Sequence, residues 1–199
     1  MQIIERNILD YFPSDLELLE KIVAKCHLCD ISYQRKHIVF GEGANNARLI
    51  IIAEAPGARE DELGKPFVGR SGELLTKMIE NAIGIKREDV YISNIIKCRP
   101  PNNRNPLNDE AMACLPYLEK QIEIIKPEII LCLGSISFHY LNNSTLSITK
   151  ARGNIFDYKG IKLIPSFHPS YLLRNPSAKK KSYRDMLLIK SILKDTIAQ

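Results

Sequence analysis

Residues 48–61 read RLIIIAEAPGARED. An apolar, β-branched run leads directly into the carboxylate of Glu54 and then into Pro56-Gly57. A near-continuous apolar run of this length is typical of a strand that is covered on both faces. The stretch therefore predicts a buried strand that delivers a carboxylate to its own end, either to cap the turn or to take part in chemistry.

Three more runs have the same strand character, so the strands are expected at 47–53, 89–96, 128–134 and 161–167. Helical patterns lie between and after them, at 71–83, 108–126, 135–141 and 182–197. Ser71 is the expected N-cap of the first helix and Gly84 its stop. Strands that alternate with helices predict one α/β domain over residues 1–199, with a mostly parallel sheet of about four strands and helices on both faces.

Each predicted strand ends in polar or small residues. The ends carry Glu54, Asn94, Gly134-Ser135 and His168. In parallel α/β sheets, ligands bind outside the carboxyl ends of the strands. A carboxylate, an amide and an imidazole are thus expected to meet at one edge, although each alone is also compatible with a turn-capping or loop role.

Composition fits an intracellular globular protein. The chain has 199 residues, of which 45% are hydrophobic and 26% charged, and no apolar run approaches the roughly 20 residues of a membrane span. The N-terminus lacks a secretory signal, so we expect a cytoplasmic, nucleoid-associated protein. Net charge is +5. Residues 129–199 alone carry 11 Lys or Arg against three Asp, which indicates either an anionic partner such as nucleic acid or a solvated basic helix face, and charge alone favours neither.

Five cysteines are present. Cys132 lies inside an apolar run and is expected in the core. The other four are the pair Cys26 and Cys29 in CHLC, with Cys98 and Cys114 farther along. In an intracellular protein such a set indicates a metal site rather than disulfides, and both zinc and an iron–sulfur cluster accept four thiolates.

Six blocks in order resemble the family 4 uracil-DNA glycosylases, the thermostable iron–sulfur type, over roughly residues 20–196. The blocks are CHLC, FGEGANNARLIIIAEAPGARED, GKPFVGRSGELL, YISNIIKCRPPNNRNP, ITKARGN and PSFHPSYLLRNP. One departure is Ala53, where the family usually has glycine before the acidic residue. Glu54 argues against the family 5 enzymes, and no histidine follows Cys98 in the way found in the uracil-DNA binders that become covalently trapped.

The resemblance implies a [4Fe-4S] cluster held by Cys26, Cys29, Cys98 and Cys114. It also implies that a flipped-out deoxyuridine loses its base at the edge of the sheet. His168 is expected to donate a hydrogen bond to uracil O2, and Glu54 to stabilise the sugar cation or orient water. Substrate contacts are expected from Asn94 at the Watson–Crick edge of uracil, from a stacking Phe67, and from Ala55 and Gly57. The stretch after Gly57, especially Glu60, is the expected wall against the thymine methyl group.

DNA contacts are expected from the loop SFHPSYLLRNP and from the basic segment after it. Candidates for a wedge that enters the duplex are Leu172, Leu173 and Arg174. Ser170, Lys179, Lys180 and Lys181, with Arg184 beside them, are expected to hold phosphates. Arg99 or Arg104 in RPPNNRNP is a further backbone contact.

The N-terminal extension, residues 1–19, contains ERNILDYF at 5–12. Ile8, Tyr11 and Phe12 resemble the motif by which repair proteins dock on the sliding clamp, although Glu5 stands where glutamine is usual. An amphipathic segment that packs on the body is the alternative. We thus expect a monomeric, monofunctional uracil-DNA glycosylase of base-excision repair. Alternatives are a non-catalytic uracil- or DNA-binding iron–sulfur protein and an iron–sulfur electron carrier.

Overall fold

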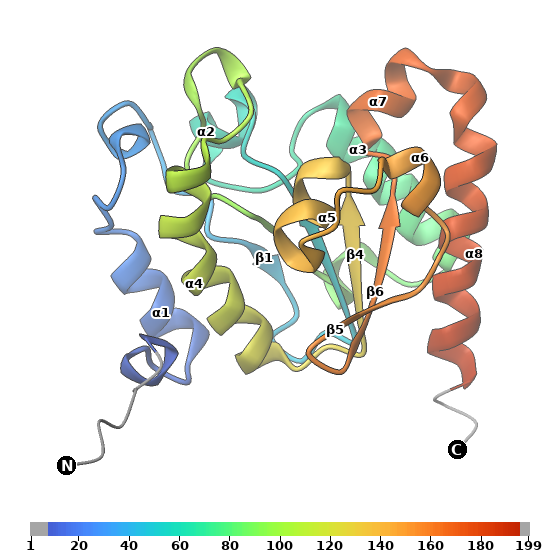
Figure 1. The fold of residues 1–199 in the computed structure, drawn as a ribbon, viewed down its shortest axis with the longest axis horizontal. Coiled ribbons are helices and arrows are strands. Elements are labelled where there is room, and N and C mark those ends of the chain that lie inside the picture. Colours follow the sequence, from blue (N-terminus) through green and yellow to red (C-terminus); the bar gives the residue numbers. More distant parts are fainter. Residues whose placement is uncertain (1–7, 196–199) are drawn as a thin grey trace.

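A computed structural model describes residues 8–195 as one α/β domain around a six-stranded mixed sheet (Figure 1). The strand order is β1-β3-β2-β4-β6-β5. The strands are β1 Glu42–Gly43, β2 Leu49–Ala53, β3 Tyr91–Asn94, β4 Ile129–Leu133, β5 Phe156–Tyr158 and β6 Ile161–Ser166. The predicted α/β fold class is confirmed.

The four predicted strands are the parallel centre of the sheet, β3-β2-β4-β6. The sheet gains two short antiparallel edge strands, β1 and β5, which apolar runs did not predict. Strand β5 joins β6 through Lys159-Gly160, where both residues have positive φ, 51° and 85°. That pair of conformations is the two-residue hairpin turn that matches strand twist.

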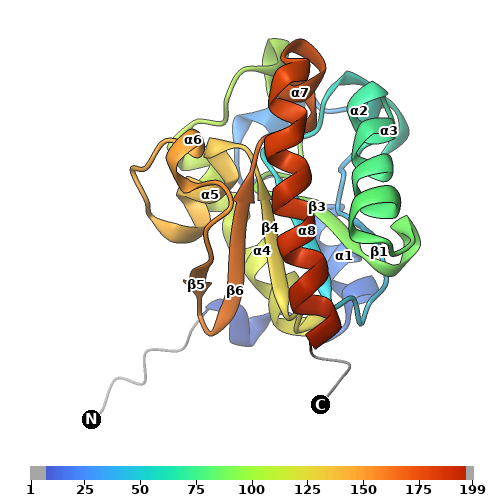
Figure 2. The ribbon, with the colours of Figure 1, turned by 90° about the vertical axis from the view of Figure 1, so that its right-hand side faces the viewer.

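Eight α-helices are described: α1 Leu16–Val23, α2 Ala58–Leu63, α3 Arg70–Lys77, α4 Asn108–Ile125, α5 Ser135–Asn142, α6 Ile148–Ala151, α7 Pro169–Arg174 and α8 Lys179–Asp195. Helices α1 and α4 lie together on one side of the sheet, and α8 runs along the other (Figures 1 and 2). No helix within residues 8–195 has the length and apolar character to cross a membrane.

Strand β2 shows how the core is divided between the two faces. Ile50 and Ile52 pack with α1, α4 and α5, while Leu49, Ile51 and Ala53 pack with α3 and α8, and all five are fully buried. Burying one such aliphatic side chain stabilises the fold by about 1.5–3 kcal/mol. This two-sided burial explains why the strand reads as a continuous apolar run.

The predicted helices form, but several ends differ. Helix α3 begins at Arg70 with Gly69 as its N-cap, so the prediction of Ser71 as the cap was wrong. It continues as π-helical turns over Met78–Ile83 and stops at Gly84. The φ of Gly84 is 86°, a left-handed conformation that glycine adopts readily because it has no Cβ. Helix α8 begins at Lys179, three residues before the predicted start, and positions 196–197 of its predicted end lie outside the described residues.

Candidate active site

A cavity of about 880 Å³ opens at the carboxyl edge of the parallel strands and is lined in part by residues of α2 and α7. Both helices lie at that edge of the sheet (Figure 1). The cavity is lined by residues from all four strand ends singled out in the sequence: Glu54, Asn94, Gly134-Ser135 and His168. The volume lies within the range of about 300–1,000 Å³ that is usual for small-molecule sites. The sheet therefore brings the carboxylate, the amide and the imidazole together, as the sequence predicted.

Glu54 follows β2 directly and its backbone is fixed. The carbonyls of Ala53 and Glu54 accept the N–H groups of Ile95 and Ile96 at 2.9 and 3.2 Å. Its side chain is partly buried at the cavity wall, and burial raises the pKa of the carboxyl above its ordinary value. A desolvated carboxylate lowers the stability of the fold. It suits a site in which a bound molecule develops positive charge during a reaction.

Asn94 is the last residue of β3, lies opposite Ala53, and is 2% exposed. Its backbone carbonyl accepts a hydrogen bond from the Lys97 ammonium at 2.9 Å. The Lys97 ammonium therefore fixes the backbone of Asn94, and Asn94 itself lines the cavity.

His168 is the N-cap residue of α7. Its Nδ1 accepts the N–H of Ser170 at 3.1 Å, and the Ser170 hydroxyl lies 2.8 Å from the same atom. Because Nδ1 is an acceptor, the proton of the neutral ring is assigned to Nε2. Burial, with a contribution from the nearby Arg174, lowers the pKa of His168 to about 4. At neutral pH this residue is an uncharged donor through Nε2.

Phe67 stacks on the His168 ring, with centroids 5.7 Å apart and planes inclined by 28°. It is buried and has a φ of +54°, a conformation that is an outlier for a bulky residue. Gly72 in α3 makes this placement possible, because a Cβ there would lie 1.8 Å from the Phe67 carbonyl oxygen. Such an outlier at a cavity wall is typical of a functional position.

Glu60, Gly57 and Ala55 all line the cavity. The Glu60 carboxylate accepts the N–H groups of Val68 and Gly69 at 3.0 and 3.3 Å, at the start of α3. A carboxylate is favourable at a helix N-terminus. Glu60 thus fastens the loop that carries Phe67, a role that the sequence did not suggest.

The DNA-contact residues predicted after His168 divide into two groups. Ser170, Leu173 and Arg174 line the cavity, and Leu173 is 40% exposed. Leu172 is only 1% exposed and packs with Phe167, so this placement corrects the prediction of Leu172 as a wedge. The side chain points into the domain because helix α7 has one inward face.

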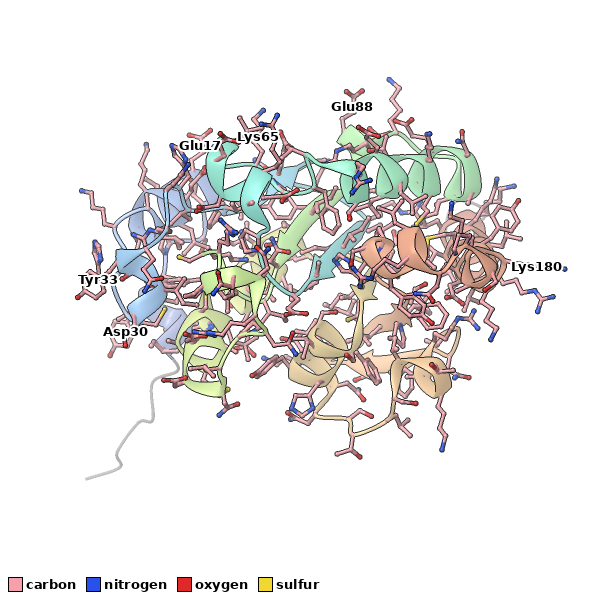
Figure 3. All side chains as sticks on the ribbon, turned by 90° about the horizontal axis from the view of Figure 1, so that it is seen from above. Glu17, Asp30, Tyr33, Lys65, Glu88 and Lys180 are labelled. Atoms are coloured by element: carbon pink, nitrogen blue, oxygen red, sulfur yellow. The ribbon has the colours of Figure 1, made fainter. Side chains whose placement is uncertain are left out.

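Residues 179–181 are three exposed lysines in the first turn of α8, and Lys180 projects far from the body (Figure 3). Positive charge is unfavourable at a helix N-terminus. That arrangement weakens the helix unless an anion covers it, which favours a phosphate-bearing partner.

The four predicted cysteine ligands line one small pocket between α1, α4 and the loop after β3. Arg35 donates to Cys98 Sγ at 3.4 Å, and the backbone N–H of Lys97 donates to Cys114 Sγ at 3.3 Å. Burial, aided by the neighbouring Cys98 and Cys26, raises the pKa of Cys114 to about 12, although Lys97 opposes the shift. Among residues 8–195, no three His, Cys, Asp or Glu side chains are arranged for a single metal ion. Four grouped thiols are a donor set that both zinc and an iron–sulfur cluster accept.

Sequence reasoning missed several residues of these sites. The cavity is also lined by Asn103, Thr149 and Tyr171. Two arginines line it as well, Arg59 in the first turn of α2 and Arg70 at the start of α3. Two glycine N-caps, Gly57 and Gly69, are a signal that could have pointed to the arginines, since both helices begin at the cavity.

Lys97 was also missed. It is 1% exposed, and burial lowers its pKa to about 8 although the neighbouring Cys114 and Cys98 oppose that shift. Its position between an apolar run and Cys98 gives no sign of burial in the sequence.

The stretch suspected of clamp binding is described from Ile8 onward, and residues 5–7 lie outside the described residues. Ile8–Tyr11 forms a short 3-10 helix in which Ile8 is 57% and Tyr11 68% exposed. Phe12 is partly buried against the core, 5.2 Å from the Tyr117 ring.

Comparison with known proteins shows the family of this chain. A family model described as the uracil DNA glycosylase superfamily matches residues 40–190. A type-4 uracil-DNA glycosylase of Thermotoga maritima is 48% identical over 164 residues, which cover 81% of this chain and 85% of that protein. One from Saccharolobus solfataricus is 46% identical over 188 residues, 90% and 87% of the two chains. A type-5 uracil-DNA glycosylase of Pyrobaculum aerophilum is 28% identical over 146 residues, 65% and 64% of the two chains. This chain therefore belongs to the uracil-DNA glycosylase superfamily and, within it, to the type-4 family.

Proposed function

We propose that this protein is a monofunctional uracil-DNA glycosylase, which hydrolyses the bond between uracil and deoxyribose and leaves an abasic site for repair. One observation carries the proposal: Glu54, Asn94 and His168, from three different strand ends, line a single cavity beside the stacked Phe67. A base can reach that cavity only after it leaves the DNA stack.

His168 supplies the donor for the departing base. As the glycosidic bond breaks, negative charge grows on uracil O2, and the neutral imidazole can donate through Nε2. Ser170 and Phe67 fix the ring by a hydrogen bond and a stack, so little reorganisation is needed. Removing one such donor typically lowers the rate by about 10²–10³.

Glu54 acts on the sugar side. Its carboxylate either stabilises the oxocarbenium-like sugar or orients the attacking water. Burial raises the pKa of Glu54, and the same poor solvation leaves the field of the ionised carboxylate weakly screened. Glu54→Ala should reduce turnover far more than DNA binding.

Selection of uracil rests on two features. The Asn94 amide can pair with uracil N3–H and O4, and cytosine would leave that pairing mismatched. Thymine differs by one methyl group, which a rigid wall must exclude, since such a group is worth only about 1–3 kcal/mol. The segment Ala55–Glu60 forms this wall in the proposal, and its anchoring through the Glu60 carboxylate supports a rigid one.

DNA is held around the mouth of the cavity. Leu173 or Arg174 on α7 is the proposed wedge, and residues 179–181 are the proposed phosphate contacts. Arg104 lies on the cavity wall, and its Nη1 donates to the buried Glu110 carboxylate at 2.8 Å, which fixes the guanidinium at the mouth of the cavity. Arg99 is tied to Asn103 at 2.8 Å on the same loop.

Cys26, Cys29, Cys98 and Cys114 would hold a [4Fe-4S] cluster. The cluster would cross-link α1, the loop after β3 and α4, and so stabilise the site by structure; no step of the reaction passes through it. Removal of iron should lower the melting temperature, as judged by visible absorbance and circular dichroism recorded together.

Docking on a sliding clamp through Ile8 and Tyr11 is a separate part of the proposal. Both side chains are exposed in a 3-10 turn, whereas Phe12 would have to leave Tyr117 to take part. Tyr11→Ala should abolish clamp affinity without changing excision. Unchanged clamp affinity would remove this part.

The central test is incubation of the purified protein with a uracil-containing oligonucleotide without magnesium, followed by alkali. Oligonucleotides with thymine or cytosine at the same position are the controls. Strand cleavage at uracil alone, and only after alkali, is expected. Tight binding of uracil-DNA without cleavage by iron-loaded protein would instead identify a binding protein.

A further inference from the structure

Within residues 8–195, the acceptors that surround the buried Lys97 ammonium include no carboxylate. Lys97 is 1% exposed and is the largest of the fully buried side chains in the part of the chain that the structure describes. Its three donors reach neutral acceptors: Ser93 Oγ at 2.6 Å, Gln121 Oε1 at 2.7 Å and the Asn94 carbonyl at 2.9 Å. Buried lysines are rare unless a charge compensates them, so this one calls for an anion.

The cysteine site offers that anion. Lys97 immediately precedes Cys98, and its own backbone N–H donates to Cys114 Sγ at 3.3 Å. Four thiolates outweigh the positive charge of a common iron–sulfur core, so the group they would hold is net negative. Arg35, hydrogen-bonded to Cys98, stands on another side of the same site.

The other end of the network lies at the catalytic cavity. Ser93 and Asn94 are the last two residues of β3, and both accept from the Lys97 ammonium. Gln121 of α4 completes the cage and is itself tied to Phe40 and Tyr91, so the ammonium has one position. A shift of Lys97 would therefore move the strand end that presents Asn94.

We infer that Lys97 is a positioning residue that couples the cysteine site to the recognition of uracil by Asn94. The negative charge of the loaded cysteine site holds the ammonium in place, and the ammonium holds the end of β3. This inference rests on the proposed function, both for the cluster and for the role of Asn94.

The test uses the wild type, Lys97→Met and the matched control Lys120→Met. Lys120 is also buried, but it has its own carboxylate partner, Glu123, at 2.8 Å. Each protein, iron-loaded and after removal of iron by a chelator, is titrated with two oligonucleotides. One carries 2′-fluoro-2′-deoxyuridine, which resists cleavage, and the other carries a tetrahydrofuran abasic analogue, which has no base for Asn94 to contact.

Lys97→Met should weaken binding of the fluorodeoxyuridine oligonucleotide about tenfold, the effect of one charged hydrogen bond, and leave abasic-analogue binding unchanged. Iron removal should weaken the wild type by a similar factor and the Lys97→Met protein no further. The cluster potential should move to more negative values in Lys97→Met, because a nearby positive charge is lost, and stay constant in Lys120→Met.

Wild-type affinity of loaded Lys97→Met for the uracil analogue, or losses that multiply when iron is also removed, would overturn the coupling. A wild type that holds no iron, or that shows no preference for the uracil analogue, would instead contradict the proposed function. If Lys97→Met does not fold, Ser93→Ala removes one acceptor and keeps the ammonium. Weaker binding of the uracil analogue alone is then expected, and equal binding of both oligonucleotides to wild type and variant overturns the inference.

Discussion

Gly72→Ala is the substitution that tests most directly whether the placement of Phe67 matters for catalysis. A methyl group at Gly72 would lie 1.8 Å from the Phe67 carbonyl oxygen and 2.3 Å from its carbonyl carbon. Carbon atoms that are not bonded to each other stay at least about 3 Å apart, so the Phe67 backbone must move by more than about 1 Å. The clash involves main-chain atoms of a residue already at φ +54°, so no side-chain rotation can relieve it.

The expected loss follows from that displacement. A misplacement of about 1 Å in a catalytic site can lower the rate about 10²-fold. Phe67 is in contact with the His168 ring, so its movement should disturb both the stacked base and the donor. Overpacking of this kind costs about 1–3 kcal/mol of folding free energy, which a domain with about 5–15 kcal/mol can lose and remain folded.

The assay is single-turnover excision from a uracil-containing oligonucleotide, with thermal unfolding measured in parallel. Gly69→Ala is the matched control, because its new Cβ would lie 3.9 Å from the nearest atom, Glu60 Oε1, in ordinary contact. Gly72→Ala should be about 100-fold slower and Gly69→Ala close to wild type. A Gly72→Ala protein that is destabilised but excises uracil within about threefold of wild type would refute the reasoning.

Three further predictions concern the cavity and its rim. In the wild type, the single-turnover rate should fall on acidification as the Glu54 carboxylate, whose pKa is raised, takes up a proton. Glu54→Gln should abolish this fall in its residual rate. His168→Ala should retain the fall, since His168 is already neutral above its pKa of about 4. Glu54→Gln should also raise the melting temperature at pH 7, by an amount that shrinks as the pH falls toward the carboxyl pKa, because the buried ionised form destabilises the fold. Leu173→Ala should slow excision from duplex DNA about tenfold more than from single strands, while Leu172→Ala should lower the free energy of unfolding by about 2–5 kcal/mol. Alanine at residues 179–181 together should reduce the slope of log affinity against log salt, measured by fluorescence anisotropy, by about 2–3.

The centre of the fold could be predicted because its strands are buried on both faces. Such strands need apolar side chains at every position, as in 49–53, and that demand is visible in a single sequence. The edge strands have no such demand. Strand β1 has two residues, both exposed, and β5 has three residues, of which Asp157 is exposed. The pairing of these strands therefore depends on the neighbouring strand rather than on their own residue pattern.

The site could be predicted only to the extent that strand ends define it. Glu54, Asn94 and His168 were identified because parallel strands place their carboxyl ends together. Leu172 and Leu173 are adjacent leucines, and nothing local distinguishes the core residue from the exposed one. The direction of the α7 helix decides, and that direction is a tertiary property.

Lys97 shows a different limit, because its environment opposes its chemical type. A lysine is ordinarily exposed, so sequence rules assign it to the surface. Its burial depends on acceptors from β3 and from α4, and the α4 acceptor, Gln121, lies 24 positions from Lys97 in the chain. The same holds for Phe67, whose left-handed backbone is tolerated only because Gly72 has no side chain. Such locally unfavourable residues lie at the cavity or directly beneath it, and the surrounding fold must hold each of them in place. Substitutions at their supports should therefore reduce activity more than stability, and Gly72→Ala with its Gly69→Ala control measures that ratio.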